Sequence, residues 1–106
     1  MQIKDIELKY KINAYRVTEE YPTERDILFD MLMFIQSTRK RKKNWAVEDF
    51  KMEFSDLEKA VPLFSIEEKK ELIKKLVYNL FDKALITYEG STMGFNKQAI
   101  EMFYKI

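Results

Sequence analysis

The sequence predicts a mainly helical α+β domain, and three observations lead to that class. Apolar residues recur at helical spacing in several stretches between residues 24 and 80. A short β-branched and aromatic run at residues 85–88 is followed by Gly90 and Gly94, the only glycines of the chain. Asn96 can then cap a final helix. The 106 residues, of which 46% are hydrophobic, suffice for one core.

Residues 1–20 are predicted as an N-terminal extension and residues 21–106 as the domain proper. Four apolar residues of the extension alternate with charged residues: Ile6, Leu8, Tyr10 and Ile12. This period of two favours a half-buried strand. A helix remains an alternative, because Ile3, Ile6 and Tyr10 also lie at helical spacing.

The first core helix is predicted to begin near Glu24 and to end near Thr38. Pro22 disfavours helical geometry in the residue before it, and Thr23 with Asp26 forms a capping-box pattern. The apolar face of this helix contains Ile27, Leu28, Met31, Leu32 and Ile35. Such a wide apolar stripe predicts that the helix lies at the centre of the core.

Two further helices are predicted before the hairpin. Asn44 is a candidate cap for the second, whose apolar face would contain Val47, Phe50, Phe54 and Leu57. Pro62 interrupts the chain after it. Ser65 and Glu68 form a capping-box pattern for the third helix, which would run for about four to five turns. Its buried face would contain Ile66, Ile73, Leu76, Val77 and Leu80.

The last predicted helix is apolar on two sides. Ala99, Met102, Phe103 and Ile106 form one side, and Ile100 and Tyr104 form the other. One side can remain exposed after the other packs on the domain, which favours a homodimer. The expected dimer interface consists of Ile100, Met102, Phe103, Tyr104 and Ile106.

Residues 76–86 resemble the end of the recognition helix and the first wing strand of bacterial or phage winged-helix proteins. That family has the pattern Leu-x3-Leu-x2-Lys-Gly-Leu-Ile, and this chain has Leu76, Leu80, Lys83, Ala84, Leu85 and Ile86. Ala84 stands where the pattern usually has glycine. Residues 95–99 are similar to the polar opening of the family's C-terminal helix. The resemblance covers about four-fifths of the chain and implies a helix-turn-helix DNA-binding fold with a transcription-regulating function.

The resemblance implies that double-stranded DNA is the partner, and two groups of basic residues are candidates for contacts with it. The first group is a run of five bases, Arg39, Lys40, Arg41, Lys42 and Lys43. The second group lies on the third helix and consists of Lys69, Lys70, Lys74 and Lys75. Asn79 is a candidate for contact with a base edge.

An acidic third helix favours an alternative function. Its predicted solvent face carries Tyr78 together with four acidic residues and two basic residues, a net charge of −2, from Glu67, Glu68, Glu71, Asp82, Lys74 and Lys75. The predicted wing tip, at residues 91–93, carries no positive charge. Phosphate groups are repelled by such a face. The alternative is therefore a winged-helix protein-interaction module, such as a phage or mobile-element product, that does not bind DNA directly.

Composition argues against an enzyme. The chain contains no histidine and no cysteine, so it offers no imidazole base, no thiolate nucleophile and no ordinary zinc site. We therefore expect no catalytic residues, no metal and no cofactor. The net charge is only +1, and no apolar stretch is long enough to cross a bilayer. A cytoplasmic protein without a membrane partner is the expectation.

Overall fold

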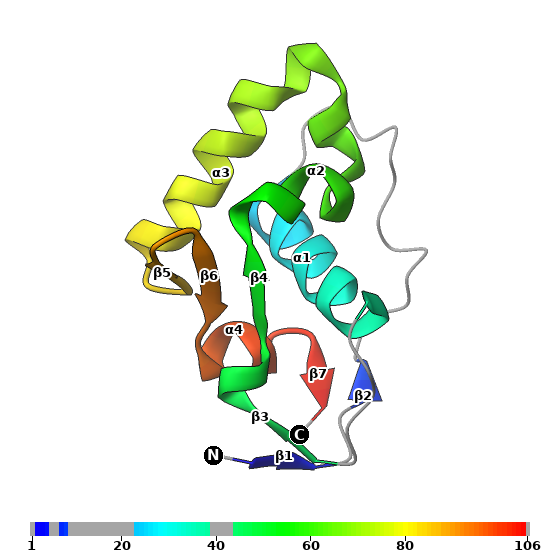
Figure 1. The fold of residues 1–106 in the computed structure, drawn as a ribbon, viewed down its shortest axis with the longest axis vertical. Coiled ribbons are helices and arrows are strands. Elements are labelled where there is room, and N and C mark those ends of the chain that lie inside the picture. Colours follow the sequence, from blue (N-terminus) through cyan, green and yellow to red (C-terminus); the bar gives the residue numbers. More distant parts are fainter. Residues whose placement is uncertain (1, 5–6, 9–22, 39–43, 106) are drawn as a thin grey trace.

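The computed structural model describes residues 2–4, 7–8, 23–38 and 44–105, which Figure 1 shows as a ribbon. Three helices come first in the domain: α1 (Glu24–Thr38), α2 (Leu57–Ala60) and α3 (Lys70–Asp82). A hairpin of β5 (Ile86–Glu89) and β6 (Thr92–Phe95) follows, and then the short helix α4 (Lys97–Glu101). This order confirms the predicted α+β class with three helices, a hairpin and a C-terminal helix.

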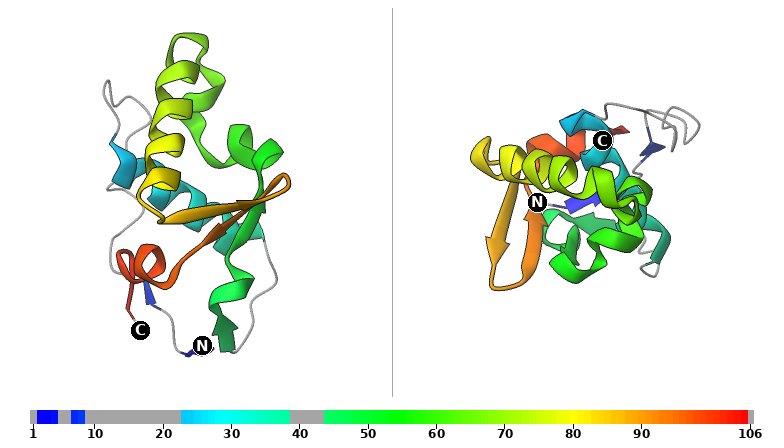
Figure 2. Two further views of the ribbon diagram at one scale, coloured as in Figure 1. Left: turned by 90° about the vertical axis from the view of Figure 1, so that its left-hand side faces the viewer. Right: turned by 90° about the horizontal axis from the view of Figure 1, so that it is seen from above.

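The hairpin belongs to a three-stranded antiparallel sheet, because β4 (Lys51–Glu53) pairs with β6 in the order β4-β6-β5. Met52, Met93 and Tyr88 lie opposite one another across the three strands. Met52 and Met93 are fully buried, whereas Lys51 and Glu53 on either side of Met52 are exposed. One face of the sheet therefore packs against the helices, and the hairpin projects beneath α3 (Figure 2).

The N-terminal strands join the domain by pairing with it. β1 (Gln2–Lys4) pairs with β3 (Asn44–Ala46), and β2 (Glu7–Leu8) pairs with β7 (Tyr104–Lys105), both antiparallel. Of the alternating segment, the structure describes Glu7 and Leu8, and both lie in β2. Ile6, Tyr10 and Ile12 lie outside the described residues.

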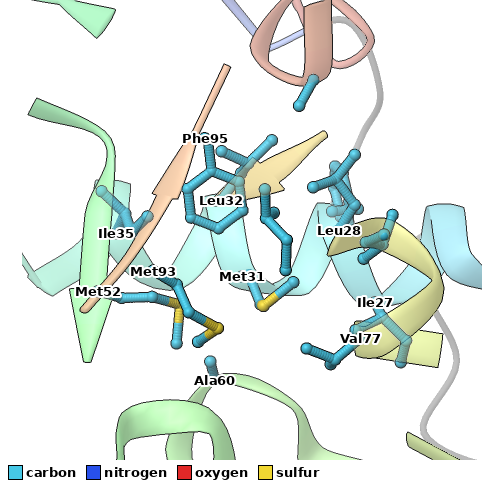
Figure 3. Close-up of a cluster of buried hydrophobic side chains, with 14 of the residues drawn as sticks. Ile27, Leu28, Met31, Leu32, Ile35, Met52, Ala60, Val77, Met93 and Phe95 are labelled. Atoms are coloured by element: carbon cyan, nitrogen blue, oxygen red, sulfur yellow. The ribbon is translucent and has the colours of Figure 1, made fainter. Parts of the chain in front are cut away.

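The first helix agrees with its prediction at both ends. The Thr23 N–H donates to Asp26 Oδ2 at 2.9 Å, and the Asp26 N–H donates to Thr23 Oγ1 at 3.3 Å, which completes the capping box. All five predicted face residues of α1 are fully buried. Figure 3 shows them at the centre of the core, with Met52 and Met93 on one side and Val77 on the other.

The predicted second helix is wrong over most of its length. Asn44 begins β3 instead of capping a helix, and 3₁₀ turns η2 (Val47–Asp49) and η3 (Phe54–Asp56) flank β4. Only α2 is helical. The predicted apolar face of this helix did not include Met52. Met52 is buried between two exposed neighbours, which is the alternation of a strand. Two bonds, Phe95 N–H to Phe50 O and Phe54 N–H to Ser91 O, extend this pairing with the hairpin.

The third helix begins later than predicted, because the turns before it are separate. The Ser65 hydroxyl donates to Pro62 O at 2.8 Å within the 3₁₀ turn η4 (Pro62–Ser65) and caps nothing. A second turn, η5 (Glu67–Lys69), precedes α3. Ile66 between them has extended backbone and is exposed, contrary to the prediction that it is buried. Ile73, Val77 and Leu80 are buried and Leu76 is partly buried, as the spacing predicts.

Ala84 occupies the left-handed position of a Schellman motif that ends α3. The Leu85 N–H donates to Leu80 O at 3.0 Å and the Ala84 N–H donates to Phe81 O at 2.9 Å. Ala84 has a φ of 60°, a left-handed conformation that glycine adopts without the steric cost of a side chain. The buried pair Leu80 and Leu85 supplies the apolar contact that accompanies the motif.

Replacing Ala84 by glycine should therefore stabilise the protein. Relief of the left-handed strain outweighs the extra chain entropy of glycine, for a net gain of about 0.5–1 kcal/mol in the free energy of unfolding. Urea denaturation of both proteins would measure it. Ala99→Gly, at a buried position inside α4, is the matched control and should lower stability. A loss of stability in Ala84→Gly would contradict this account of the motif.

Candidate interaction surface

Aromatic side chains gather where the hairpin meets the end of α3. The exposed fractions are 60% for Tyr78, 43% for Phe81 and 36% for Phe54, and Tyr88 is half-buried between the last two. The Tyr88 ring centroid lies 4.9 Å from that of Phe81 and 6.4 Å from that of Phe54. These four residues are called the aromatic surface below.

Helical geometry places two of these rings on the outside of α3. Tyr78 follows Val77 and Phe81 follows Leu80, and each step turns the side chain by about 100° away from the buried stripe. Most large apolar side chains of the described residues are buried, so exposure of two aromatic rings on one helix end is unusual here.

Tyr88 belongs to the inner face of the sheet but lies at its margin. Its row continues through Met93 and Met52 into the core. Its hydroxyl is buried and has no hydrogen-bond partner among the described residues. Burial, and secondarily the nearby Tyr78, raise the pKa of Tyr88. The phenol is therefore protonated at neutral pH and retains an unused hydrogen-bonding group.

The tip of the hairpin is held against β4. Glu53 accepts hydrogen bonds from Ser91 Oγ at 2.8 Å and from Thr92 Oγ1 at 2.9 Å. The Phe54 N–H donates to Ser91 O at 2.8 Å, and Gly90 turns the chain with a φ of 64°. These contacts fix the tip of the hairpin relative to Phe54.

Two of the lysines predicted to contact DNA from the third helix are paired with acids. Lys70 pairs with Glu67 at 3.3 Å and Lys74 pairs with Glu71 at 3.6 Å. Lys69 is partly buried, and Lys75 is exposed. The run of five bases, Arg39, Lys40, Arg41, Lys42 and Lys43, lies outside the described residues.

Asn79 lies on the side of α3 that faces α1. The pKa of Glu24 is lowered, first of all by a hydrogen bond from Lys83 and also by a hydrogen bond from Asn79 and the positive charge of Lys83. Partial burial of Glu24 acts in the opposite direction and raises this pKa. Lys83 is ion-paired with Glu24. The predicted contact of Asn79 with a base edge would require it to leave this carboxylate.

The residues predicted to form a dimer interface are mostly inside the protomer. Exposed fractions are 0% for Ile100, 2% for Phe103 and 1% for Tyr104, and Met102 packs partly buried against the core. Ile106 lies outside the described residues. The expectation that one side of the last helix stays exposed is wrong, because α4 ends at Glu101 and the chain then enters β7. The homodimer itself stays a prediction, now without this surface.

Comparison of the chain with protein-family models, with curated proteins and with solved structures finds no match. Within the described part of the chain, no group of carboxylates is arranged to hold a metal ion. The described helices also include none that is long and apolar enough to span a bilayer. The aromatic surface is therefore the feature from which a function is best argued.

Proposed function

We propose that this chain is a non-enzymatic winged-helix-like module that binds a protein partner through the aromatic surface. The observation that carries this proposal is the exposure of Tyr78 and Phe81 beside the half-buried Tyr88. Aromatic residues are enriched at the energetic centres of protein interfaces, where burial of each ring contributes strongly to affinity. Exposed apolar clusters of this kind mark interaction sites.

Electrostatics favour a protein over duplex DNA at this surface. Asp82 on α3 and Glu89 on the hairpin are exposed acids, Lys70 and Lys74 are paired with Glu67 and Glu71, and Lys75 is an exposed base on the same helix. Affinity for duplex DNA depends on unpaired cations that displace counterions from phosphate. An aromatic surface without an excess of positive charge is better matched to apolar side chains of a protein partner.

Double-stranded DNA is the second candidate partner. The observation that favours it is the run of five consecutive bases at residues 39–43, which could contact a phosphate backbone independently of α3. In that case the protein would bind duplexes with little sequence preference, because phosphate contacts do not read bases.

Site-specific photo-crosslinking in the cells that encode this protein tests the proposal. A benzophenone amino acid at position 78 should form a discrete adduct with one protein, because this ring is the most exposed of the surface. The same group at Gln98, which is exposed on α4, is the matched control and should not form that adduct. Phe81→Ala should reduce the adduct about tenfold or more.

Three outcomes would count against protein binding at this surface. They are equal adducts from positions 78 and 98, no adduct from position 78, and an adduct that Phe81→Ala leaves unchanged. An adduct with nucleic acid from position 78 would favour the second candidate instead.

A further inference from the structure

The side of α3 that points away from the domain carries four exposed side chains in one line. Glu71, Lys75, Tyr78 and Asp82 are all exposed and follow one another at intervals of four, three and four residues. Because each residue turns the helix by about 100°, this spacing keeps the four side chains within a narrow stripe opposite the buried residues of α3. In Figure 1, α3 runs along the left-hand side of the molecule, and α1 lies behind it when that side faces the viewer in Figure 2. These four residues are called the outer stripe below, and their spacing is that of the seam along which two helices of a coiled coil meet.

The outer stripe has opposite charges on either side of Tyr78. Lys75 lies three residues before Tyr78, and Asp82 lies four residues after it. Within the described part of the chain, neither Lys75 nor Asp82 forms an ion pair, whereas Glu71 is paired with Lys74. Positions 75 and 82 are equally distant from the midpoint between residues 78 and 79. If two copies of α3 run antiparallel with a twofold axis at this midpoint, Lys75 of each copy therefore lies level with Asp82 of the other.

The same axis brings the exposed ring of Tyr78 onto its own copy. Tyr78 is 60% exposed, and at the axis its ring would pack against Tyr78 of the second copy. Phe81 lies on the flank of the outer stripe, and a twofold axis places this flank of both helices on the same side. Each exposed Phe81 would then border the pair of Tyr78 rings. An aromatic centre with a polar rim is the usual anatomy of a protein interface.

We propose that the partner of the aromatic surface is a second copy of this chain, bound antiparallel along α3, with the two Tyr78 rings at the symmetry axis and Lys75 of each copy paired with Asp82 of the other. This inference rests on the proposed protein-binding function and names the partner of the same surface. The rings supply most of the affinity, and the ion pairs fix the direction and register of the helices. The 13 residues of α3 span only about 20 Å, so the contact is small and the dimer is reversible.

Equilibrium sedimentation of the purified chain over a range of protein concentrations tests the dimer. The wild type should associate reversibly into dimers. Lys75→Glu alone or Asp82→Lys alone turns both attractions into repulsions, so each should weaken association about tenfold. Combining Lys75→Glu with Asp82→Lys in one chain restores both attractions and should restore the dimer. Lys59→Glu, at an exposed position of α2, is the matched charge control and should leave association unchanged.

Mixing the two single-substitution variants tests the register. In a mixed antiparallel dimer, the new carboxylate at position 75 of one chain faces the new ammonium group at position 82 of the other, and the unchanged Asp82 and Lys75 also face each other. The mixture should therefore associate about tenfold more tightly than either variant alone. A wild type that stays monomeric would overturn the inference, and so would a wild-type dimer that neither charge reversal weakens.

Removal of the central ring tests the aromatic contribution. Tyr78→Ala should weaken association about tenfold or more, because it removes a ring of both copies at the axis. Ile66→Ala is the matched control, because Ile66 is also an exposed apolar residue but lies before α3, away from the outer stripe. It should leave association unchanged, and circular dichroism checks that both variants keep their fold. Equal effects of the two substitutions would overturn the placement of Tyr78 at the axis.

The outcomes separate this inference from the proposed function. A cellular adduct from position 78 with a different protein, together with a purified chain that stays monomeric, would overturn self-association while leaving protein binding intact. Charge-dependent dimers of the purified chain without a cellular adduct from position 78 would support the α3 interface and would contradict the cellular function proposed for it. An adduct that contains two copies of this chain would support both.

Discussion

Replacing Phe103 by alanine is expected to destabilise the protein by about 3–5 kcal/mol. The side chain is 2% exposed, its ring centroid lies 5.2 Å from that of Phe29, and the guanidinium carbon of Arg25 lies 5.6 Å from its ring. Truncation removes this contact with α1 and leaves a cavity. The free energy of unfolding from urea denaturation measures the effect.

Met102 supplies the matched control for this substitution. It neighbours Phe103 in sequence but is only partly buried, so Met102→Ala should cost clearly less than Phe103→Ala. If Phe103 instead acted at a dimer interface, its truncation would yield folded monomers of nearly unchanged intrinsic stability. Sedimentation of Phe103→Ala together with its unfolding curve distinguishes the two cases.

Prediction from sequence succeeded where local signals and burial agreed. For α1, the capping box at Thr23 and Asp26 and the spacing of its apolar residues describe the same segment. For the end of α3, the apolar spacing up to Leu80 and the β-branched and aromatic run at residues 85–88 predicted a change from helix to strand, and the left-handed Ala84 lies between them. These features depend on residues close together in the chain, which a sequence displays directly.

The failures concern residues whose role depends on distant partners. β4 is a three-residue strand, and its pairing with β6 joins Met52 to Met93, far along the chain. Its flanks also fit a helical spacing, so the pattern alone could not favour a strand. Phe103 and Tyr104 fit an exposed helix face equally well, but the chain leaves α4 before them and turns them inward.

The aromatic surface could be anticipated only in part. The spacing placed Tyr78 on the solvent face of the third helix, and this exposure is confirmed. Phe54 was assigned to a buried helical face, whereas it is exposed beside Tyr88 after β4. The missed signal was the run of aromatic residues at 78, 81 and 88 around the predicted turn, which suits neither a phosphate contact nor a core stripe.

Stability at alkaline pH should depend on Tyr104. Burial raises the pKa of this phenol well above its usual value of 10.0, and its hydroxyl donates to Gln36 Oε1 at 2.8 Å. The folded state therefore retains a proton that the unfolded chain releases near pH 10. This contribution is complete below pH 10 and is lost as the pH rises towards the folded-state pKa, at about 1.4 kcal/mol per pH unit.

Comparison of the wild type with Tyr104→Phe isolates the contribution of the Tyr104 phenol to stability at alkaline pH. The variant should be less stable near neutral pH by about 1 kcal/mol, because it leaves Gln36 without its donor. Between pH 10 and pH 12 its stability should fall less steeply than that of the wild type. Tyr88→Phe is the matched control, since burial raises the pKa of Tyr88 as well but the ring is only half-buried, and it should flatten the curve less. Parallel curves for Tyr104→Phe and the wild type would show that Tyr104 ionises without unfolding the protein, and hence that β7 opens separately from the core.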